Sequence, residues 1–522
     1  MAIHHVELAP GAPPGREAKP DEAVSEVEGS QTYDVVVVGG GGSGLAAALE
    51  ARTLGRRVVL IEKNAKLGGS TAWSVGSVTA SRTPHQIAQG VEDSPEAHWR
   101  DMAAFNGGLD NRDNPGLRRV LADDMPDTFR WLLDHGVRFT GPMPEPPHQK
   151  PRMHNVLPNS RAFIRHLEKA ARRAGVTIVT EARARALVTG NGGVTAVDCE
   201  TPRGLKRFVA RGGIVLAAGD FTNDPELKQR YMGAQEAKAS GVNPTATGDG
   251  QKLALQLGAR ILNGDLALGP ELRFVPPQRQ NLLLMLPPWP WLASFMAWSL
   301  AHMPQALLRP FIMSFVTTAL APSLDLFEAG ALLVNKTGAR FCDERAAPAL
   351  HVPDQPGGIA YILLDARMAA QFNGWPHFIS TAPGVAYAYL ADYRRNRRDI
   401  YHAAPTLEAL AARLGMSSGA LKRTVNDTNN NEVTGAHPPF GAGPYVALGP
   451  ARAVFVHNEG GLAVDHAHRV LGADDAPIPG LYAAGSTGQG GLLLKGHGHH
   501  LAWAFVSGRR AGRNAAQAAG TS

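Results

Sequence analysis

Cysteine is scarce in this chain, because its 522 residues include only Cys199 and Cys342. The two cysteines lie far apart, and no C-x-x-C or C-x-x-C-H pattern occurs. The sequence therefore excludes a disulfide scaffold, a structural zinc site and a c-type haem. So little cysteine is typical of a protein that works in a reducing compartment, which predicts a cytoplasmic location.

Concentrated charge is also missing from the chain. The net charge is +6, but the basic residues are scattered, so we do not expect a nucleic-acid partner. The first thirty residues lack the apolar segment of a signal peptide, and we expect residues 1–30 to form a disordered tail.

No uninterrupted apolar run is long enough to cross a membrane, since a spanning helix needs about 20 such residues. Segment 281–324 has almost no charge, but it is divided into short pieces by Pro287, Pro288, Pro290, Pro304 and Pro310. Three interpretations stay open for this segment: buried core, an apolar substrate funnel, or a patch that rests on a membrane surface.

The chain does contain a nucleotide-binding pattern at residues 33–63, YDVVVVGGGGSGLAAALEARTLGRRVVLIEK. Four valines predict a buried strand, and the G-x-G-x-x-G glycines Gly39, Gly41 and Gly44 lead into a helix. These glycines allow a tight turn, the approach of backbone to a pyrophosphate, and close helix–strand packing. A second strand ends at Glu62, whose carboxylate can accept hydrogen bonds from a ribose. The segment therefore predicts dinucleotide binding.

Later glycine-rich segments favour FAD over NAD. Directly after Glu62, the sequence KNAKLGGSTAWSVGS replaces the plain helix that an NAD enzyme would begin there. Residues 212–224 and 480–485 form two more glycine-rich segments. Three separate segments that contact one ligand suit the extended FAD molecule. The residues that we expect to bind FAD are Gly39, Gly41, Gly42, Ser43, Gly44, Glu62, Lys63, Gly69, Ser70, Thr71, Ala184, Ala218, Gly219, Asp249, Gly485, Ser486, His500 and Leu501.

The predicted fold class is α/β, with a Rossmann-like FAD-binding domain and an inserted α+β cap. Strand and helix patterns typical of the nucleotide domain run through residues 31–265, including a hairpin around residues 191–193. The spacing of the glycines changes over residues 266–442, and we predict that these residues form the substrate-binding cap. Residues 443–518 then return to the FAD-binding domain.

The chain resembles the flavoproteins of the fumarate reductase and succinate dehydrogenase type, which include the 3-ketosteroid dehydrogenases. The resemblance extends from Tyr33 to Ala516. The stretches that carry it are VVVVGGGGSGLAAAL, EKNAKLGGSTAWSVGS, VLAAGDFTND, ATGDGQKLALQLGA, LLVNKTGARFCDE, EGGLAVD and GLYAAGSTG. The resemblance implies an extended FAD whose isoalloxazine ring lies between the nucleotide domain and the cap. Ser70 stands where respiratory members attach FAD through a histidine, which implies non-covalent FAD.

The same resemblance places two substrate-binding positions. In HNEGG, His457 matches a histidine that contacts the substrate carboxylate in soluble fumarate reductases. Lys495 matches an arginine of those enzymes, and it keeps the charge but loses the bidentate fork. Gly269 and Pro348 stand where two further catalytic residues of fumarate reductases would lie, so a small dianionic substrate is disfavoured.

A ketosteroid-dehydrogenase-like site is also only partly present. Gly498, in GHGHH, matches a glycine whose backbone N–H polarises a ketone in those enzymes. Leu494 stands where one of their tyrosines would be, and DERAAP lacks the other. The chain is therefore expected to be a divergent branch between the two groups.

The stretch 480–512 supplies the remaining expectations. A helix that begins near His499 would direct its positive end at the flavin, and Lys495, His497, His499 or His500 could hold or move a proton there. His457, Lys495, Gly498 and His499 are the candidate catalytic residues. We expect no metal, because the histidines lack i, i+4 spacing and have no acid nearby in sequence.

The predicted function is hydride transfer between FAD and the carbon–carbon bond next to a carbonyl, in a hydrophobic, steroid-like or terpenoid substrate. Electrons would pass through a separate acceptor or donor. One alternative is a reductase of an unsaturated carboxylate that His457 and Lys495 hold. The other is a flavin-bound, membrane-associated binder without turnover.

Overall fold

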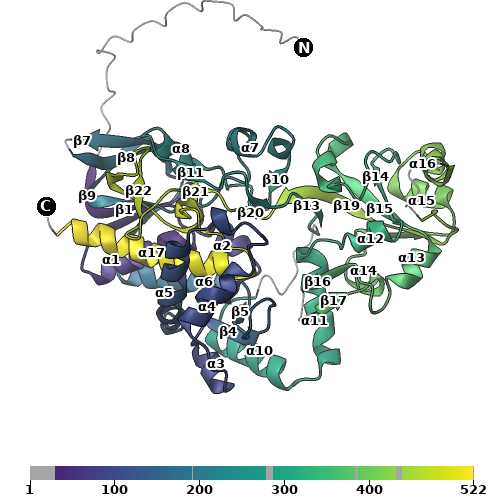
Figure 1. The fold of residues 1–522 in the computed structure, drawn as a ribbon, viewed down its shortest axis with the longest axis horizontal. Coiled ribbons are helices and arrows are strands. Elements are labelled where there is room, and N and C mark those ends of the chain that lie inside the picture. Colours follow the sequence, from purple (N-terminus) through teal and green to yellow (C-terminus); the bar gives the residue numbers. More distant parts are fainter. Residues whose placement is uncertain (1–29, 191, 278–285, 383–385, 431–437, 521–522) are drawn as a thin grey trace, which may run out of the picture.

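The computed structural model describes residues 30–520 apart from residue 191 and segments 278–285, 383–385 and 431–437. The predicted tail and the tip of the predicted hairpin at residue 191 lie outside the described residues. Figure 1 shows two bodies that the chain crosses more than once, one around the purple and yellow ends and one in green.

A parallel sheet forms the centre of the first body. Its strand order is β22-β23-β9-β1-β2-β6, and β1, β2, β6, β9 and β23 run parallel. Strands β7 and β8 extend β9 as an antiparallel meander. The strand bounds are β1 Gln31–Val38, β2 Val58–Ile61, β6 Thr177–Val179, β7 Arg183–Gly190, β8 Gly193–Thr201, β9 Gly204–Leu216, β22 Arg469–Leu471 and β23 Pro477–Ala483. This is the predicted Rossmann-like arrangement.

Two helices from opposite ends of the chain pack on each other beside this sheet. Helix α1 spans Gly42–Thr53 and helix α17 spans His499–Ala518. A Cβ on Gly508 would lie 2.4 Å from the carbonyl oxygen of Ser43, so only glycine allows this approach. Glu50 of α1 fixes the pair by accepting from Arg509 at 2.9 Å. The middle of α17 is thereby held against the first turns of α1.

Smaller elements complete the first body. A three-stranded antiparallel sheet has the order β3-β5-β4. Its strands and the neighbouring helices are β3 Ser77–Thr79, β4 Arg138–Met143, β5 Met153–Leu157, α2 Gly69–Trp73, α3 Pro84–Ala88, α4 Pro95–Ala103, α5 Pro115–Asp134, α6 Arg161–Arg173, α7 Pro225–Tyr231 and α8 Asp249–Leu255. Strand β3 contacts α17, which brings it to the same end of that helix.

A six-stranded sheet organises the second body, with its own hydrophobic core drawn from residues 239–455. Strand β19 is its central strand, because it pairs with β10, β13, β15 and β18. The bounds are β10 Ser240–Gly241, β13 Glu271–Phe274, β14 Leu332–Asn335, β15 Ala360–Leu364, β18 Tyr401–Ala404, β19 Tyr445–Phe455, α12 Asp325–Glu328, α13 Ala366–Gln371, α14 Leu390–Asn396, α15 Leu407–Leu414 and α16 Ser418–Asn430. The domain boundaries at 265/266 and 442/443 stay predictions.

Short strands join the two bodies. The pairs are β11 Ile261–Leu262 with β21 Gly461–Leu462, and β12 Ala267–Leu268 with β20 His457–Asn458. A further hairpin, β16 Ser380–Ala382 with β17 Ala386–Ala388, lies against α11. His457 therefore stands on one of the crossing strands.

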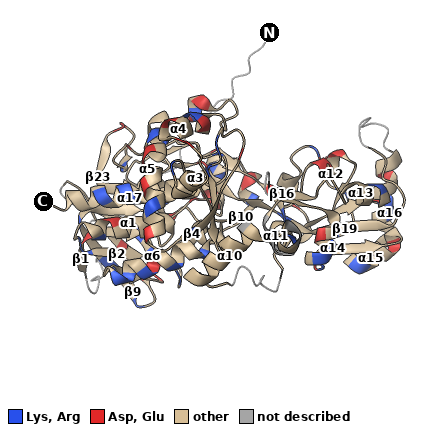
Figure 2. Cartoon of the chain, turned by 90° about the horizontal axis from the view of Figure 1, so that it is seen from below, with Lys and Arg blue, Asp and Glu red and all other residues tan. Residues whose placement is uncertain are grey.

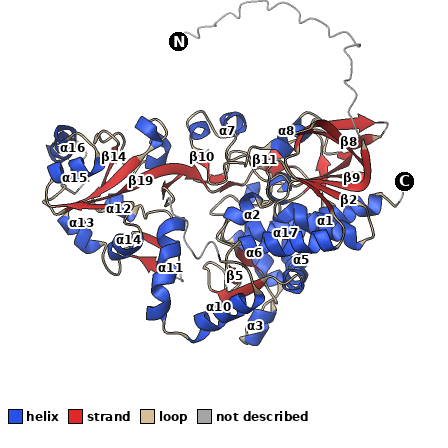
Figure 3. Ribbon diagram, turned by 180° about the vertical axis from the view of Figure 1, so that it is seen from behind, coloured by secondary structure: helices blue, strands red, loops and turns tan. Residues whose placement is uncertain are grey.

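The proline-rich apolar segment folds as two helices, α10 Pro290–His302 and α11 Gln305–Ala319. Figures 1 and 3 show α10 at the lower edge of the molecule, below β5. Trp291, Phe295 and Trp298 are 65%, 56% and 54% exposed, so these side chains are not buried core. None of the helices among the described residues combines the length and apolarity needed to span a bilayer. Figure 2 draws α10 without charged residues.

Candidate active site

The nucleotide-binding turn has an open cradle at the start of α1. A Cβ on Gly44 would lie 1.8 Å from the Gly39 carbonyl oxygen, so this glycine is needed for packing alone. A Cβ on Gly41 would meet nothing closer than 3.9 Å, so space is left above its backbone. The N-cap residue Gly41 provides no side-chain cap, so apart from the Gly42 N–H, which Thr71 Oγ1 accepts, the first N–H groups of α1 can face an anion. The cradle therefore fits a pyrophosphate.

The three glycine-rich segments meet at this cradle, as the sequence predicts. A Cβ on Gly69 would lie 3.3 Å from the Gly41 Cα, and one on Gly485 would lie 2.7 Å from the Ser43 Oγ. The Gly42 N–H donates to the Thr71 Oγ1 at 3.1 Å. Other contacts tie in further predicted residues: Asn243 Nδ2 donates to Ser70 Oγ at 2.9 Å, and Thr487 Oγ1 donates to the carbonyl oxygen of Gly219, which follows Ala218, at 2.9 Å.

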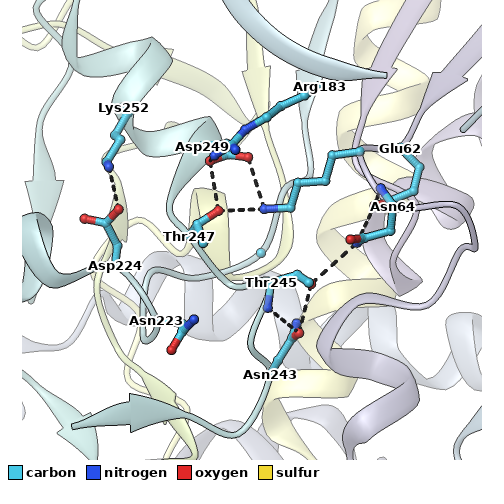
Figure 4. A network of polar contacts seen from close by, with 12 residues as sticks. Glu62, Asn64, Arg183, Asn223, Asp224, Asn243, Thr245, Thr247, Asp249 and Lys252 are labelled. Atoms are coloured by element: carbon cyan, nitrogen blue, oxygen red, sulfur yellow. Dashed lines mark hydrogen bonds and ion pairs between the residues drawn. The ribbon is translucent and has the colours of Figure 1, made fainter. Parts of the chain in front are cut away.

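A polar network surrounds the end of β2 (Figure 4). Glu62 accepts from the Gly40 N–H at 2.8 Å, so its carboxylate lies beside the turn. Lys63 Nζ lies 3.1 Å from Asp249, which also pairs with Arg183 at 3.0 Å, one residue before Ala184 on β7. Burial alone would raise the pKa of Asp249, but these two cations outweigh it and lower the pKa. The network joins β2, β7 and α8 around the expected ribose position.

His457 and His500 lie together at the other end of the cradle. Their ring centroids are 3.8 Å apart, and both Nε2 atoms face one oxygen of Glu459, at 3.7 Å from His457 and 3.4 Å from His500. Burial and repulsion by His500 lower the pKa of His457. Burial would raise the pKa of Glu459, but the charge of His500 and hydrogen bonds from both imidazoles hold it well below its usual value.

Glu459 is the functional residue that sequence reasoning missed. It lies two residues after His457, in the HNEGG motif, but nothing in the sequence indicates that it also reaches His500. We expected no metal because no acidic residue lies near His497, His499 and His500 in the sequence. In the fold, acidic residues from distant segments lie beside two of these histidines. Glu459 lies against His500, and Glu145 lies 2.6 Å from His497 Nδ1. That expectation stays untested.

His499 faces away from His457 into a separate buried cluster. Its Nε2 lies 3.4 Å from the Nε2 of His98, and its Nδ1 lies 2.6 Å from the Lys495 carbonyl oxygen, which Nδ1–H can satisfy. His148 completes the cluster, and burial followed by repulsion from His499 lowers its pKa to about 2. The structure therefore does not bring His499 together with His457.

The remaining predicted residues lie around the loop before α17. Lys495 Nζ donates to the Asn106 carbonyl oxygen at 3.4 Å. Gly498 caps α17 with φ of +89°, and a Cβ there would lie 2.7 Å from Thr79 of β3. Leu501 packs against the first core, and the carbonyl oxygen of Ser486 lies beside Gly461. These positions surround the N-terminus of α17.

Residues 34–283 and 293–493 match the family described as FAD binding domain, and the chain belongs to that family. A probable fumarate reductase of Shewanella frigidimarina is 28% identical over 513 residues, covering 94% of this chain and 75% of the relative. The open conformation of a flavocytochrome c3 fumarate reductase matches with 26% identity and a TM-score of 0.68, over 94% of this chain and 79% of that one.

A 3-ketosteroid-Δ4-(5α)-dehydrogenase from Rhodococcus jostii RHA1, solved with 4-androstene-3,17-dione, has the same fold. Its TM-score is 0.58 at 23% identity, over 94% of this chain and 98% of that one. The cofactor of this chain is FAD, and the protein is an FAD-dependent oxidoreductase that acts on CH–CH groups of a small molecule.

Proposed function

We propose that the protein interconverts the CH–CH and C=C forms of the bond next to a carbonyl group in a largely apolar substrate. The observation that carries this proposal is the His457–Glu459–His500 cluster, which provides proton-handling imidazoles instead of an arginine clamp. In the desaturation direction, one carbon loses a hydride, which bound FAD accepts, and its neighbour loses a proton.

The roles proposed for the other residues follow from their positions. The N-terminus of α17 would stabilise negative charge that develops close to it, and Gly498 would offer its N–H to the substrate carbonyl oxygen. Lys495 would act on the substrate only where that substrate carries a carboxylate, whose negative charge it would stabilise. Fully buried His499 would hold the loop through the Lys495 carbonyl rather than touch substrate.

Reduction of an unsaturated carboxylate is the second candidate, favoured by the similarity to a fumarate reductase. In that case His457 and Lys495 would hold the acid group. A flavin-bound protein without turnover is the third candidate, since both catalytic tyrosines and the arginine clamp are replaced.

Anaerobic titration of the FAD-loaded protein separates these candidates. We expect cyclic ketones to bleach the flavin, and cyclic enones to reoxidise the reduced flavin. H457A should slow the first reaction about 100-fold, because general acid–base catalysis typically contributes 10²–10⁴-fold. K495A should change ketone rates little but raise the KM of unsaturated acids about tenfold or more, since a hydrogen bond to a charged group contributes roughly 1.5–3 kcal/mol.

The matched control is K238A, which removes an exposed lysine paired with Asp354 in the second body. Reoxidation by unsaturated acids but not by enones would favour the second candidate. No bleaching or reoxidation with any ketone, enone or acid would favour the third. Release of all FAD on acid denaturation would support non-covalent binding at Ser70.

We also propose two partners. Electrons would reach or leave FAD through a separate carrier. The exposed face of α10, defined by Trp291, Phe295 and Trp298, would rest on a membrane surface, from which an apolar substrate could enter. An apolar helix that stays exposed needs such a partner, because it gains nothing from facing water.

A further inference from the structure

Glu459 is a buried carboxylate with two differently bound oxygens. Its side chain is only 4% exposed. One oxygen, Oε2, accepts from Gln489 Nε2 at 2.5 Å and from the Leu494 N–H at 3.0 Å. These neutral donors hold the carboxylate in place below the loop that leads to α17.

Within the described part of the chain, the polar contacts of the other oxygen, Oε1, are with the two imidazoles. His500 Nε2 lies 3.4 Å from it and His457 Nε2 lies 3.7 Å from it. The imidazole rings contact each other, and their side chains are 19% and 23% exposed, so both can meet a substrate or solvent on their outer edges. Glu459 therefore connects the protein interior to the accessible edge of the site.

The charge balance around this oxygen favours one positive charge on the imidazole pair, which is one proton more than two neutral rings carry. A buried ionised carboxylate needs a positive partner, and two imidazolium ions in contact would repel each other. Asp220 also interacts electrostatically with His457, and burial raises the pKa of Asp220. Lys495 donates elsewhere and His499 belongs to the separate cluster.

We propose that Glu459 is a positioning residue that holds one positive charge on the His457–His500 pair, so that one imidazole is protonated at both nitrogens and the other is neutral. This inference rests on the proposed function and deepens it. We assign the neutral form to His457, because its Nε2 lies farther from the carboxylate oxygen than that of His500, and burial together with His500 also lowers its pKa.

The unit supplies a base for desaturation and an acid for the reverse reaction. In desaturation, His457 accepts the proton from one substrate carbon while the neighbouring carbon gives its hydride to FAD, and the new C=C bond takes the electrons of the C–H bond that His457 breaks. The pair then carries two positive charges, and it releases one proton to solvent, since both rings are partly exposed. Bound FAD would supply the hydride acceptor, and the separate carrier proposed above would take up the two electrons.

Nitrogen NMR of the FAD-loaded protein labelled with 15N-histidine tests the unit without any substrate. H457N and H500N assign the two rings. At pH 7 we expect one charged and one neutral ring in the wild type, two neutral rings in E459Q, and recovery of the charged ring in E459D. The pH at which the pair takes up its first proton should fall by at least about one unit in E459Q, because an opposite charge within contact distance shifts a pKa by roughly 1–3 units.

E344Q is the matched control, because Glu344 is an equally buried carboxylate that pairs with Arg340 in the second body. It should lower the unfolding temperature without changing the histidine signals. If the proposed function holds, E459Q should also lower kcat about tenfold or more with little change in KM, and shift the pH–rate profile. The NMR result stands independently of whether a ketone is turned over.

Two results would overturn the proposal. Identical ring protonation in E459Q and the wild type would leave Glu459 as an anchor of the 492–495 loop only. A stoichiometric metal ion in the purified protein that E459Q removes would make the cluster a metal centre instead.

Discussion

At the scale of the residue, the glycines of one motif have different physical roles. Gly44 and Gly39 are in such close contact that no side chain fits, whereas Gly41 faces open space. Gly41 also has a φ of −83°, which alanine adopts without strain. Packing and cofactor binding can therefore be separated by single substitutions.

G41A should leave the apoprotein within about 0.5 kcal/mol of the wild-type free energy of unfolding, because its Cβ meets no protein atom closely. It should weaken FAD binding at least about tenfold, since the methyl group occupies the pyrophosphate position. G44A should instead destabilise the apoprotein by about 1–3 kcal/mol through overpacking. Thermal unfolding of the apoproteins and fluorescence titration with FAD measure both. Equal loss of apoprotein stability in the two variants would contradict this assignment.

At the scale of the element, successive residues of a helix can serve unrelated sites. His499 and His500 both begin α17, yet adjacent helical residues point about 100° apart, which directs one to His98 and the other to Glu459. Those partners lie 401 and 41 residues away in sequence. The motif at 39–44 and the FAD cradle follow from local patterns, but these long-range pairings depend on how β20, α4 and α17 pack, which no local pattern encodes.

Helix α10 carries the element-scale prediction. W291S/F295S should reduce cosedimentation with phospholipid vesicles about 100-fold, because each aromatic side chain transferred from water contributes roughly 1.5–3 kcal/mol. The unfolding temperature of this double variant should stay near that of the wild type, as both replaced side chains are exposed. L205S, which alters an exposed apolar side chain on β9, should bind vesicles normally. Wild-type protein that remains in the supernatant with every vesicle composition would refute the membrane contact.

At the scale of the whole molecule, three buried histidines of the first body make stability sensitive to acid. Burial and then repulsion by His499 lower the pKa of His148 to about 2, and burial lowers those of His154 and His468 to about 3. The unfolded chain takes up protons on these groups below pH 6.5 while the folded chain does not. Stability is therefore present above pH 6.5 and is lost as the pH falls from 6.5 toward 3.

H468N tests this prediction. His468 is fully buried with φ of +62°, a conformation that asparagine tolerates. Removing its titration should flatten the fall in unfolding free energy by up to about 1.4 kcal/mol per pH unit between pH 6.5 and 3. Calorimetry of the wild type and H468N across that range gives the two slopes. Parallel slopes would show that His468 does not contribute.

The place of β23 in the central sheet has a consequence for biosynthesis. β23 pairs with β9, and α17 lies along α1, so the last-made segments complete a layer begun by the first. When residues 31–476 have left the ribosome, the nucleotide-binding turn at residues 39–44 is available, but Gly485 and the histidines of α17 are not. Cofactor loading should therefore wait until the segment from Gly485 through α17 has been made and has folded, and a nascent polypeptide stalled before that point should stay colourless even in abundant FAD.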